Sequence, residues 1–177
     1  MLNYNNLSDI EFEYLCEDVM SRLLRTNLRR FGSGRDDGID LVDNIKSKNI
    51  IVQVKHYIKT DVSGLISSLK KELPKIKKLT PKQYYICCSK ELTPNKIEEI
   101  YDIFSDYMTD DTCIITLLEI ENFLNKPDNV DILTKHLKLW MPSTNILHKM
   151  CTNDISIDSA VLFNNIKENE KLFVQTR

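Results

Sequence analysis

Apolar and polar positions along the chain switch between helical and strand-like periods, in an order that predicts an α/β domain. A helical apolar stripe follows the capping-box pair Ser8 and Glu11 and continues to about Leu24. Strands are expected at 27–31, 39–42, 50–55, 83–89 and 113–118, and further helices at about 61–79, 93–108 and 119–124. The order helix, three strands, helix, strand, helix, strand, helix predicts a mixed sheet with helices on both faces, because hairpins give antiparallel pairs and β-α-β crossovers give parallel ones.

Prolines mark two breaks in this pattern. Pro74 lacks an amide proton, so the helix that contains it is expected to kink or end near Leu73. Lys126-Pro127-Asp128-Asn129 indicates a boundary, which divides the chain into a main domain at 1–126 and a helical appendage or linker at 127–177. Helices are expected there at 130–141, 145–151 and 157–172, and Trp140 is expected to be buried where the appendage packs on the main domain.

The runs at 39–42 and 50–55 predict a hairpin with candidate chemistry at its open end. If the turn is centred between Lys46 and Ser47, Asp40 lies directly opposite Gln53. Cross-strand neighbours have Cβ atoms about 5 Å apart, so the two side chains could share a metal ion. Alternation along the strand places Lys55 on the same face as Gln53. The alternative is that these are ordinary polar residues on the solvent face of a hairpin.

Charge and cysteine content indicate which partners and which cellular compartment suit the protein. The formal net charge is −2, yet segment 44–82 carries many lysines and only Asp61 and Glu72 as acids. Such a stripe suits an anionic partner such as nucleic acid, and it equally suits a solvated helix face. The five cysteines lack a CxxC spacing and mostly lie in apolar runs, which predicts free buried thiols. No secretory signal pattern or bilayer-length apolar run is present, which predicts the cytoplasm.

Four short motifs follow one another along the chain: Phe12-Glu13, Gly38-Ile39-Asp40, Gln53-Val54-Lys55, and Ile86-Cys87-Cys88-Ser89 followed by Thr93-Pro94. They resemble the motifs of the Mrr-like restriction endonucleases, a branch of the PD-(D/E)xK nuclease superfamily. The resemblance covers about residues 7–125. It implies a restriction-endonuclease-like αβββαβ core, with a mixed central sheet flanked by helices, followed by the C-terminal helical appendage.

The same resemblance implies roles for individual residues. Asp40, Gln53 and the Val54 carbonyl would be ligands of Mg²⁺ or Mn²⁺, and Glu13 would complete the site. Lys55 would be the catalytic lysine. Two other groups near these motifs are not expected to be catalytic. His56 is expected to be structural or, at most, a phosphate or water contact. Asp36 and Asp37 are expected to accept hydrogen bonds from backbone amides of the glycine-rich turn.

The activity implied is metal-dependent hydrolysis of DNA with little sequence specificity, by a homo-oligomer when active. Double-stranded DNA would bind a lysine-rich face formed by Lys59, Lys70, Lys71 and Lys75. Two alternatives are a nucleic-acid-binding module of nuclease fold that has lost catalysis and a protein-interaction domain. The first alternative is motivated by Gln53, an amide where a second acid would bind the ion more strongly.

A second resemblance concerns the end of the chain. Segments 138–144 and 171–176 are similar to stretches that precede a nucleotide-binding module in antiviral STAND ATPases. The sequence contains no Gly-x-x-x-x-Gly-Lys-Ser/Thr motif for binding ATP. The resemblance therefore implies a bacterial anti-phage effector domain, with a possible downstream ATPase module in a longer parent protein. His148 and Cys151 have a His-x-x-Cys spacing without a second pair, which disfavours a metal site there.

Overall fold

The computed structural model describes residues 2–31 and 39–140. Its helices are α1 (Asp9–Leu23), α2 (Val62–Leu79), α3 (Pro94–Phe104), α4 (Leu117–Leu124) and α5 (Val130–Lys135). Its strands are β1 (Arg29–Arg30), β2 (Leu41–Val42), β3 (Ile50–Lys55), β4 (Gln83–Cys88) and β5 (Ile114–Ile115). Short 3₁₀ turns lie at η1 (Tyr4–Asn6), η2 (Asp111–Cys113), η3 (Pro127–Asn129) and η4 (Leu137–Leu139).

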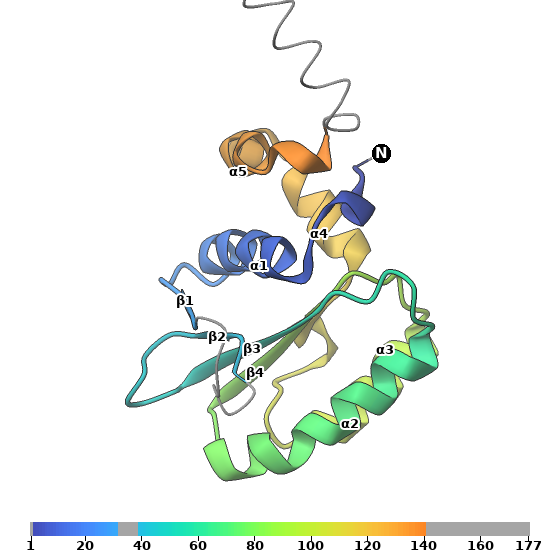
Figure 1. Ribbon diagram of the computed structural model, residues 1–177. Helices are drawn as coiled ribbons and strands as arrows, with labels where there is room; N and C mark the ends of the chain where they lie inside the picture. Colours follow the sequence, from blue (N-terminus) through green and yellow to red (C-terminus); the bar gives the residue numbers. More distant parts are fainter. Residues whose placement is uncertain (1, 32–38, 141–177) are drawn as a thin grey trace, which may run out of the picture. The chain divides into compact units, whose positions relative to one another are not determined.

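The five strands form one mixed sheet, in the order β1-β2-β3-β4-β5. The first two pairings are antiparallel and the last two are parallel. Helices cover both faces: α1 and α4 lie on one face, with α5 beyond them, and α2 and α3 lie on the other (Figure 1). The predicted order of elements and the predicted mixed sheet are both confirmed.

Two apolar clusters, one on each face, fix which way the side chains of β3 point. Val52 and Val54 belong to the cluster that packs under α1, whereas Ile51 belongs to the cluster under α2 and α3. Because strand side chains alternate between faces, Gln53 and Lys55 lie on the α2 side. The predicted division of β3 into two faces is therefore confirmed.

Helix α1 begins with the predicted capping box. The Ser8 backbone amide donates to Glu11 Oε2 at 2.9 Å, and the Glu11 amide donates to Ser8 Oγ at 3.3 Å. These bonds satisfy donors that the first helical turn leaves open. Glu11 also accepts from Lys138 Nζ at 2.6 Å, and mainly this bond lowers the pKa of Glu11 to about 2.

Helix α2 runs through Pro74, so of the two predicted outcomes an end near Leu73 is wrong, while a kink there stays a prediction. Asp61 caps its start by accepting from the Gly64 amide at 2.8 Å. Proline costs about 3 kcal/mol in a helix interior. Lys70, whose carbonyl loses its helical partner at Pro74, and Pro74 itself are exposed, while Leu69 and Ile76 on either side are completely buried. We infer that burial of this apolar face outweighs the one missing backbone bond.

The end of the sheet also differs from the prediction. Strand β5 has only two residues, and α4 begins at Leu117, two residues before the predicted start. The reason is a second capping box: the Thr116 amide donates to Glu119 Oε2 at 2.9 Å and the Thr116 hydroxyl bonds the same carboxylate. Helix α3 ends at Phe104, earlier than the predicted Met108.

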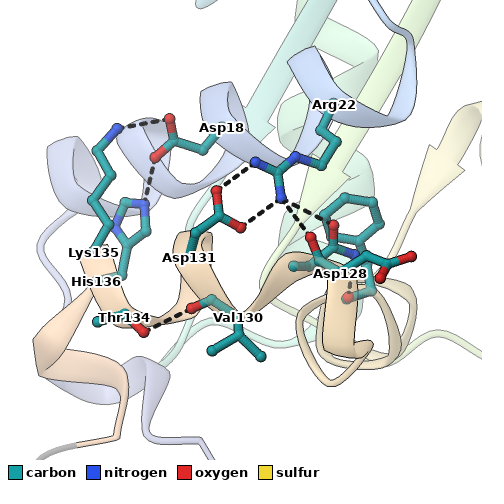
Figure 2. A network of polar contacts seen from close by, with 10 residues as sticks. Asp18, Arg22, Asp128, Val130, Asp131, Thr134, Lys135 and His136 are labelled. Carbon is teal, nitrogen blue, oxygen red and sulfur yellow. Dashed lines mark hydrogen bonds and ion pairs between the residues drawn. The ribbon is translucent and has the colours of Figure 1, made fainter.

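Residues 127–139 pack on α1 through charged side chains (Figure 2). Arg22 pairs with Asp131 at 2.6 Å, and Asp18 accepts from Lys135 and from His136, each at 2.7 Å. Instead of one helix over 130–141, this segment forms α5 followed by the turn η4.

Other expectations for the C-terminal part have mixed outcomes. Trp140 retains 44% of its surface exposed, so the prediction that it is buried is wrong. The division of the chain at 126/127 stays a prediction. The predicted helices at 145–151 and 157–172, the tail segments and the pair His148 and Cys151 lie outside the described residues. Among the helices of the described part, none is long and apolar enough to cross a bilayer.

Candidate functional site

The hairpin register places Asp40 opposite Gln53, as the sequence predicts. Leu41 pairs with Val52 and Val42 with Ile51, so the next pair outward is Asp40 with Gln53. Gln53 Nε2 donates a hydrogen bond to Asp40 Oδ2. The Val54 amide donates to the same oxygen at 2.6 Å. Strand β2 is shorter than the predicted 39–42, and the Asp40 carboxylate takes the place of the next strand carbonyl.

A pocket of about 220 Å³ opens at this end of the hairpin. Its walls come from α1, from the residue before β2, and from the end of β3 and the chain beyond it; they are Asp9, Glu13, Asp40, Val54, Lys55, His56 and Tyr57. Three of the four predicted catalytic side chains therefore line one pocket. The fourth, Gln53, is 2% exposed and lies against Asp40 without lining the pocket.

The oxygen donors of this pocket fit a hard divalent cation. Gln53 Oε1 is buried and has no hydrogen-bond partner, whereas its Nε2 faces Asp40. A half-turn of the amide exchanges the two atoms and presents Oε1 beside the Asp40 carboxylate. The Val54 carbonyl leaves β3 on the same side as its amide, toward Asp40, because both groups of a strand residue point to one neighbour. Mg²⁺ prefers such carboxylate, amide and carbonyl oxygens.

The donor set is poor in charge. Across residues 2–31 and 39–140, no group of three or more His, Cys, Asp or Glu side chains is arranged to hold a metal ion. Asp40 and Glu13 are the two predicted acids, and the amide of Gln53 carries no charge. A cation bound by this set would retain much of its hydration, which is usual for Mg²⁺.

Lys55 is paired with an acid that the motif analysis did not single out. Its Nζ lies 3.2 Å from Glu72 Oε1 on α2, and the side chains of Lys55 and Glu72 are only 14% and 12% exposed. The other oxygen of Glu72 lies 2.7 Å from Lys75 Nζ. Burial by itself would raise the pKa of Glu72, but the bond from Lys75 and the charge of Lys55 hold it below its ordinary value. The available signal was that Glu72 is the one acid in the lysine-rich sequence of α2.

His56 joins α1 to the end of β3. Its ring stacks on Phe12 with centroids 4.5 Å apart, and its Nε2 donates to the Leu7 carbonyl at 3.1 Å. Burial lowers the pKa of His56, against the effect of that bond, so the neutral ring is favoured. This geometry supports the structural role that the sequence favours, and the predicted contact with phosphate or water stays a prediction.

The lysines predicted to face DNA lie on the surface of α2 and on the loop before it. Lys59, Lys70, Lys71 and Lys75 are all exposed. Lys70 lies 3.5 Å from Glu99 of α3, and Lys75 contacts Glu72. Asp36 and Asp37 fall outside the described residues. The free, buried thiols are confirmed for Cys16, Cys87, Cys88 and Cys113.

Comparison with known proteins finds a family model and a relative that are similar to this chain. Residues 4–78 match the family model of a restriction endonuclease, the Mrr catalytic domain. The chain is also 28% identical over 153 residues to an uncharacterized protein, y4cD, of Sinorhizobium fredii (strain NBRC 101917 / NGR234). That alignment covers 86% of this chain and 24% of the relative, so the chain spans about a quarter of the relative's length.

The family match includes every element that builds the pocket. It runs from η1 through α1 and the β2–β3 hairpin to the last turn of α2, and so contains Glu13, Asp40, Gln53, Lys55 and Glu72. The mixed five-stranded sheet with helices on both faces agrees with a restriction-endonuclease-like fold. The match over residues 4–78 supports a Mrr-like nuclease domain of the PD-(D/E)xK type in this part of the chain.

Proposed function

We propose that this domain hydrolyses phosphodiester bonds of double-stranded DNA with the help of Mg²⁺ or Mn²⁺ and with little sequence specificity. One observation carries the proposal: Glu13, Asp40 and Lys55, from three separate segments, line a single pocket. The buried, unpartnered oxygen of Gln53 beneath Asp40 supplies a further donor. If these residues were only polar side chains on the solvent face of a hairpin, there would be no reason for an acid of α1 to line the same pocket.

The chain's own residues would divide the work of hydrolysis. Asp40, Gln53 and the Val54 carbonyl would hold the cation, which when bound polarises the scissile phosphate and acidifies a water molecule. Lys55 would stabilise the negative charge that grows on the phosphate oxygens, or orient the attacking water. Glu13 would reach the site through a bridging water or a second ion. The water oxygen bonds to phosphorus, the bond to one ribose oxygen breaks, and the water's proton ends on that leaving oxygen through solvent.

The exposed lysines of α2 would contact the DNA backbone. Lys59, Lys70, Lys71 and Lys75 are exposed, and Lys75 contacts Glu72, the acid that pairs with Lys55. Contacts to phosphate carry no sequence information, which is the reason for expecting low specificity. Such binding weakens steeply with salt, since each neutralised phosphate releases counterions.

Plasmid nicking tests the proposal directly. Supercoiled plasmid is incubated with the protein and Mg²⁺, with EDTA as the metal-free arm. Lys55→Met removes the catalytic ammonium, and Lys135→Met, at an exposed lysine of α5 that pairs with Asp18, is the matched control. We expect nicking by the wild type and by the control, a much slower residual nicking by Lys55→Met, and none in EDTA.

The other outcomes each assign a different function. Equal nicking by wild type and Lys55→Met would refute the role of the lysine. DNA binding without cleavage, unaffected by Asp40→Asn, would identify a nucleic-acid-binding module. No measurable DNA affinity at about 50 mM salt, where phosphate contacts are strong, would identify a protein-interaction domain.

The biological setting forms a second part of the proposal. The chain spans about a quarter of its relative, and its tail resembles stretches that precede a nucleotide-binding module. We propose a defence effector that is part of a larger protein and acts as a homo-oligomer. Light scattering of the isolated chain, compared with nicking by a version fused to an inducible dimeriser, tests the oligomer: activity that rises with dimerisation supports it, and equal activity of monomer and dimer contradicts it.

A further inference from the structure

We propose that Glu72 is a positioning residue of the nuclease site, which holds the Lys55 ammonium at the pocket and away from the Asp40 oxygens. The inference rests on the proposed nuclease function and adds a residue to it. The observation that carries it is the pairing of two largely buried side chains, Lys55 Nζ with Glu72 Oε1 at 3.2 Å.

Lys55 has acids on two sides. Together with Glu13 and Asp40 it lines the pocket, while its ammonium contacts Glu72 on α2. A lysine side chain is flexible, and its rotamer entropy opposes any single position. Without a fixed counter-charge, the ammonium would turn toward the pocket carboxylates, where it would occupy the place of a cation.

Glu72 is itself well held. It projects from α2, which spans eighteen residues, and its second oxygen contacts Lys75 at 2.7 Å. Only 12% of its side chain is exposed, so solvent screens the pair much less than it screens a surface pair. An acid anchored in this way can fix the position of the lysine relative to Asp40.

The test compares Glu72→Gln with Glu99→Gln. Both exchange a lysine-paired glutamate for an isosteric amide, but Glu99 pairs with Lys70 and Lys96 and does not line the pocket. We expect Glu72→Gln to lower kcat by between about tenfold and 100-fold, the effect of a displaced catalytic group. We also expect a higher Mg²⁺ concentration for half-maximal rate, whereas Glu99→Gln should change neither quantity more than about twofold.

A double-mutant comparison separates positioning from general structural damage. If Glu72 acts through Lys55, adding Glu72→Gln to Lys55→Met should not reduce the residual activity further. An equal loss in both backgrounds would overturn the inference. So would a Glu72→Gln enzyme with kcat and Mg²⁺ dependence within twofold of wild type.

A measurement that needs no DNA cleavage uses ¹⁵N-labelled lysine and NMR. The Lys55 ammonium should give a slowly exchanging resonance in the wild type, because it is paired and 14% exposed. Lys55→Arg assigns that resonance, which should vanish in Glu72→Gln. Its absence from wild type would overturn the positioning role even if Glu72→Gln fails to fold, while leaving the nuclease function intact. If the Lys55 resonance exchanges slowly in a protein that cuts no DNA, the nuclease function is refuted, and the Lys55–Glu72 pair then has no catalytic role.

Discussion

Two replacements of Asp40 separate what its carboxylate does for the fold from what it does for a cation. Asp40 Oδ2 accepts from Gln53 Nε2 and from the Val54 amide, and Gln53 and Val54 are 2% and 7% exposed. Alanine removes the acceptor of both donors. A buried donor left without a partner costs about 1–3 kcal/mol, so Asp40→Ala should lower the free energy of unfolding by about 2–6 kcal/mol.

Asparagine keeps an oxygen that can accept both bonds. A bond to a charged acceptor is stronger than one to a neutral acceptor by about 1 kcal/mol, and loss of a partly buried charge acts in the opposite direction. Asp40→Asn should therefore change the free energy of unfolding by about 1 kcal/mol or less. It removes the charge that would bind the cation, so cleavage should fall by at least about 100-fold.

The assays are urea unfolding without metal and Mn²⁺ binding followed by paramagnetic resonance, together with plasmid nicking. The expected result is a split: Asp40→Ala loses stability and metal binding, whereas Asp40→Asn loses only metal binding and cleavage. Asp40→Asn with nicking within threefold of wild type would refute the assignment of the metal ligand. If Asp40→Ala lowers the free energy of unfolding by less than about 1 kcal/mol, the Gln53 and Val54 donors do not depend on the Asp40 carboxylate as their acceptor.

Three further predictions concern neighbouring parts of the structure. Gln53→Glu places a second carboxylate at the site, so it should destabilise the metal-free protein and strengthen Mg²⁺ binding; an Mg²⁺-induced rise in melting temperature no larger than in wild type would contradict this. Asp131 has its pKa lowered to about 2, mainly by the bond from Arg22. Because the pKa of Asp131 is lower in the folded than in the unfolded protein, the ion pair adds stability above pH 3.8, and this stability is lost as the pH falls toward 2. Urea unfolding between those pH values should show the loss in wild type and a smaller one in Asp131→Asn. An equal dependence of the unfolding free energy on pH in the two proteins would contradict a stabilising Arg22–Asp131 pair. Phe12→Ala removes a completely buried ring that stacks on His56, and it should cost about 3–5 kcal/mol in urea unfolding; a loss under about 1 kcal/mol would show that the site relaxes around the gap.

The parts of the fold that the sequence predicts well depend on local rules. The register of the β2–β3 hairpin follows from the centre of its turn, because strand alternation leaves no freedom once one pair is set. The start of α1 follows from Ser8 and Glu11, which satisfy open amides within one turn. These two features bring Asp40 opposite Gln53 and place Glu13 in the first turns of α1.

Other features depend on contacts between distant segments. Lys55 and Glu72 meet because α2 packs back over β3. Hydrophobic periodicity predicts which face of a helix is buried, but it does not predict which strand residue that face will contact. Pro74 stays helical because packing on both sides of it outweighs one lost bond. The start of α4 was misplaced although its signal is local: Thr116 followed by Glu119 is a capping box at the end of an apolar run that also suits a strand.

Additional residues can be inserted in the turn of the β2–β3 hairpin, but β2 cannot be lengthened at the open end of the hairpin. One more backbone pair beyond Leu41 would compete with the carboxylate for the Val54 amide, so lengthening β2 there would close the hollow. At the opposite end, the loop residues Asn44 to Ser47 are exposed, and doubling a loop's length costs only about 0.6 kcal/mol. That turn is therefore the place to graft a fluorophore or an affinity tag when the chemistry of the hollow must remain untouched.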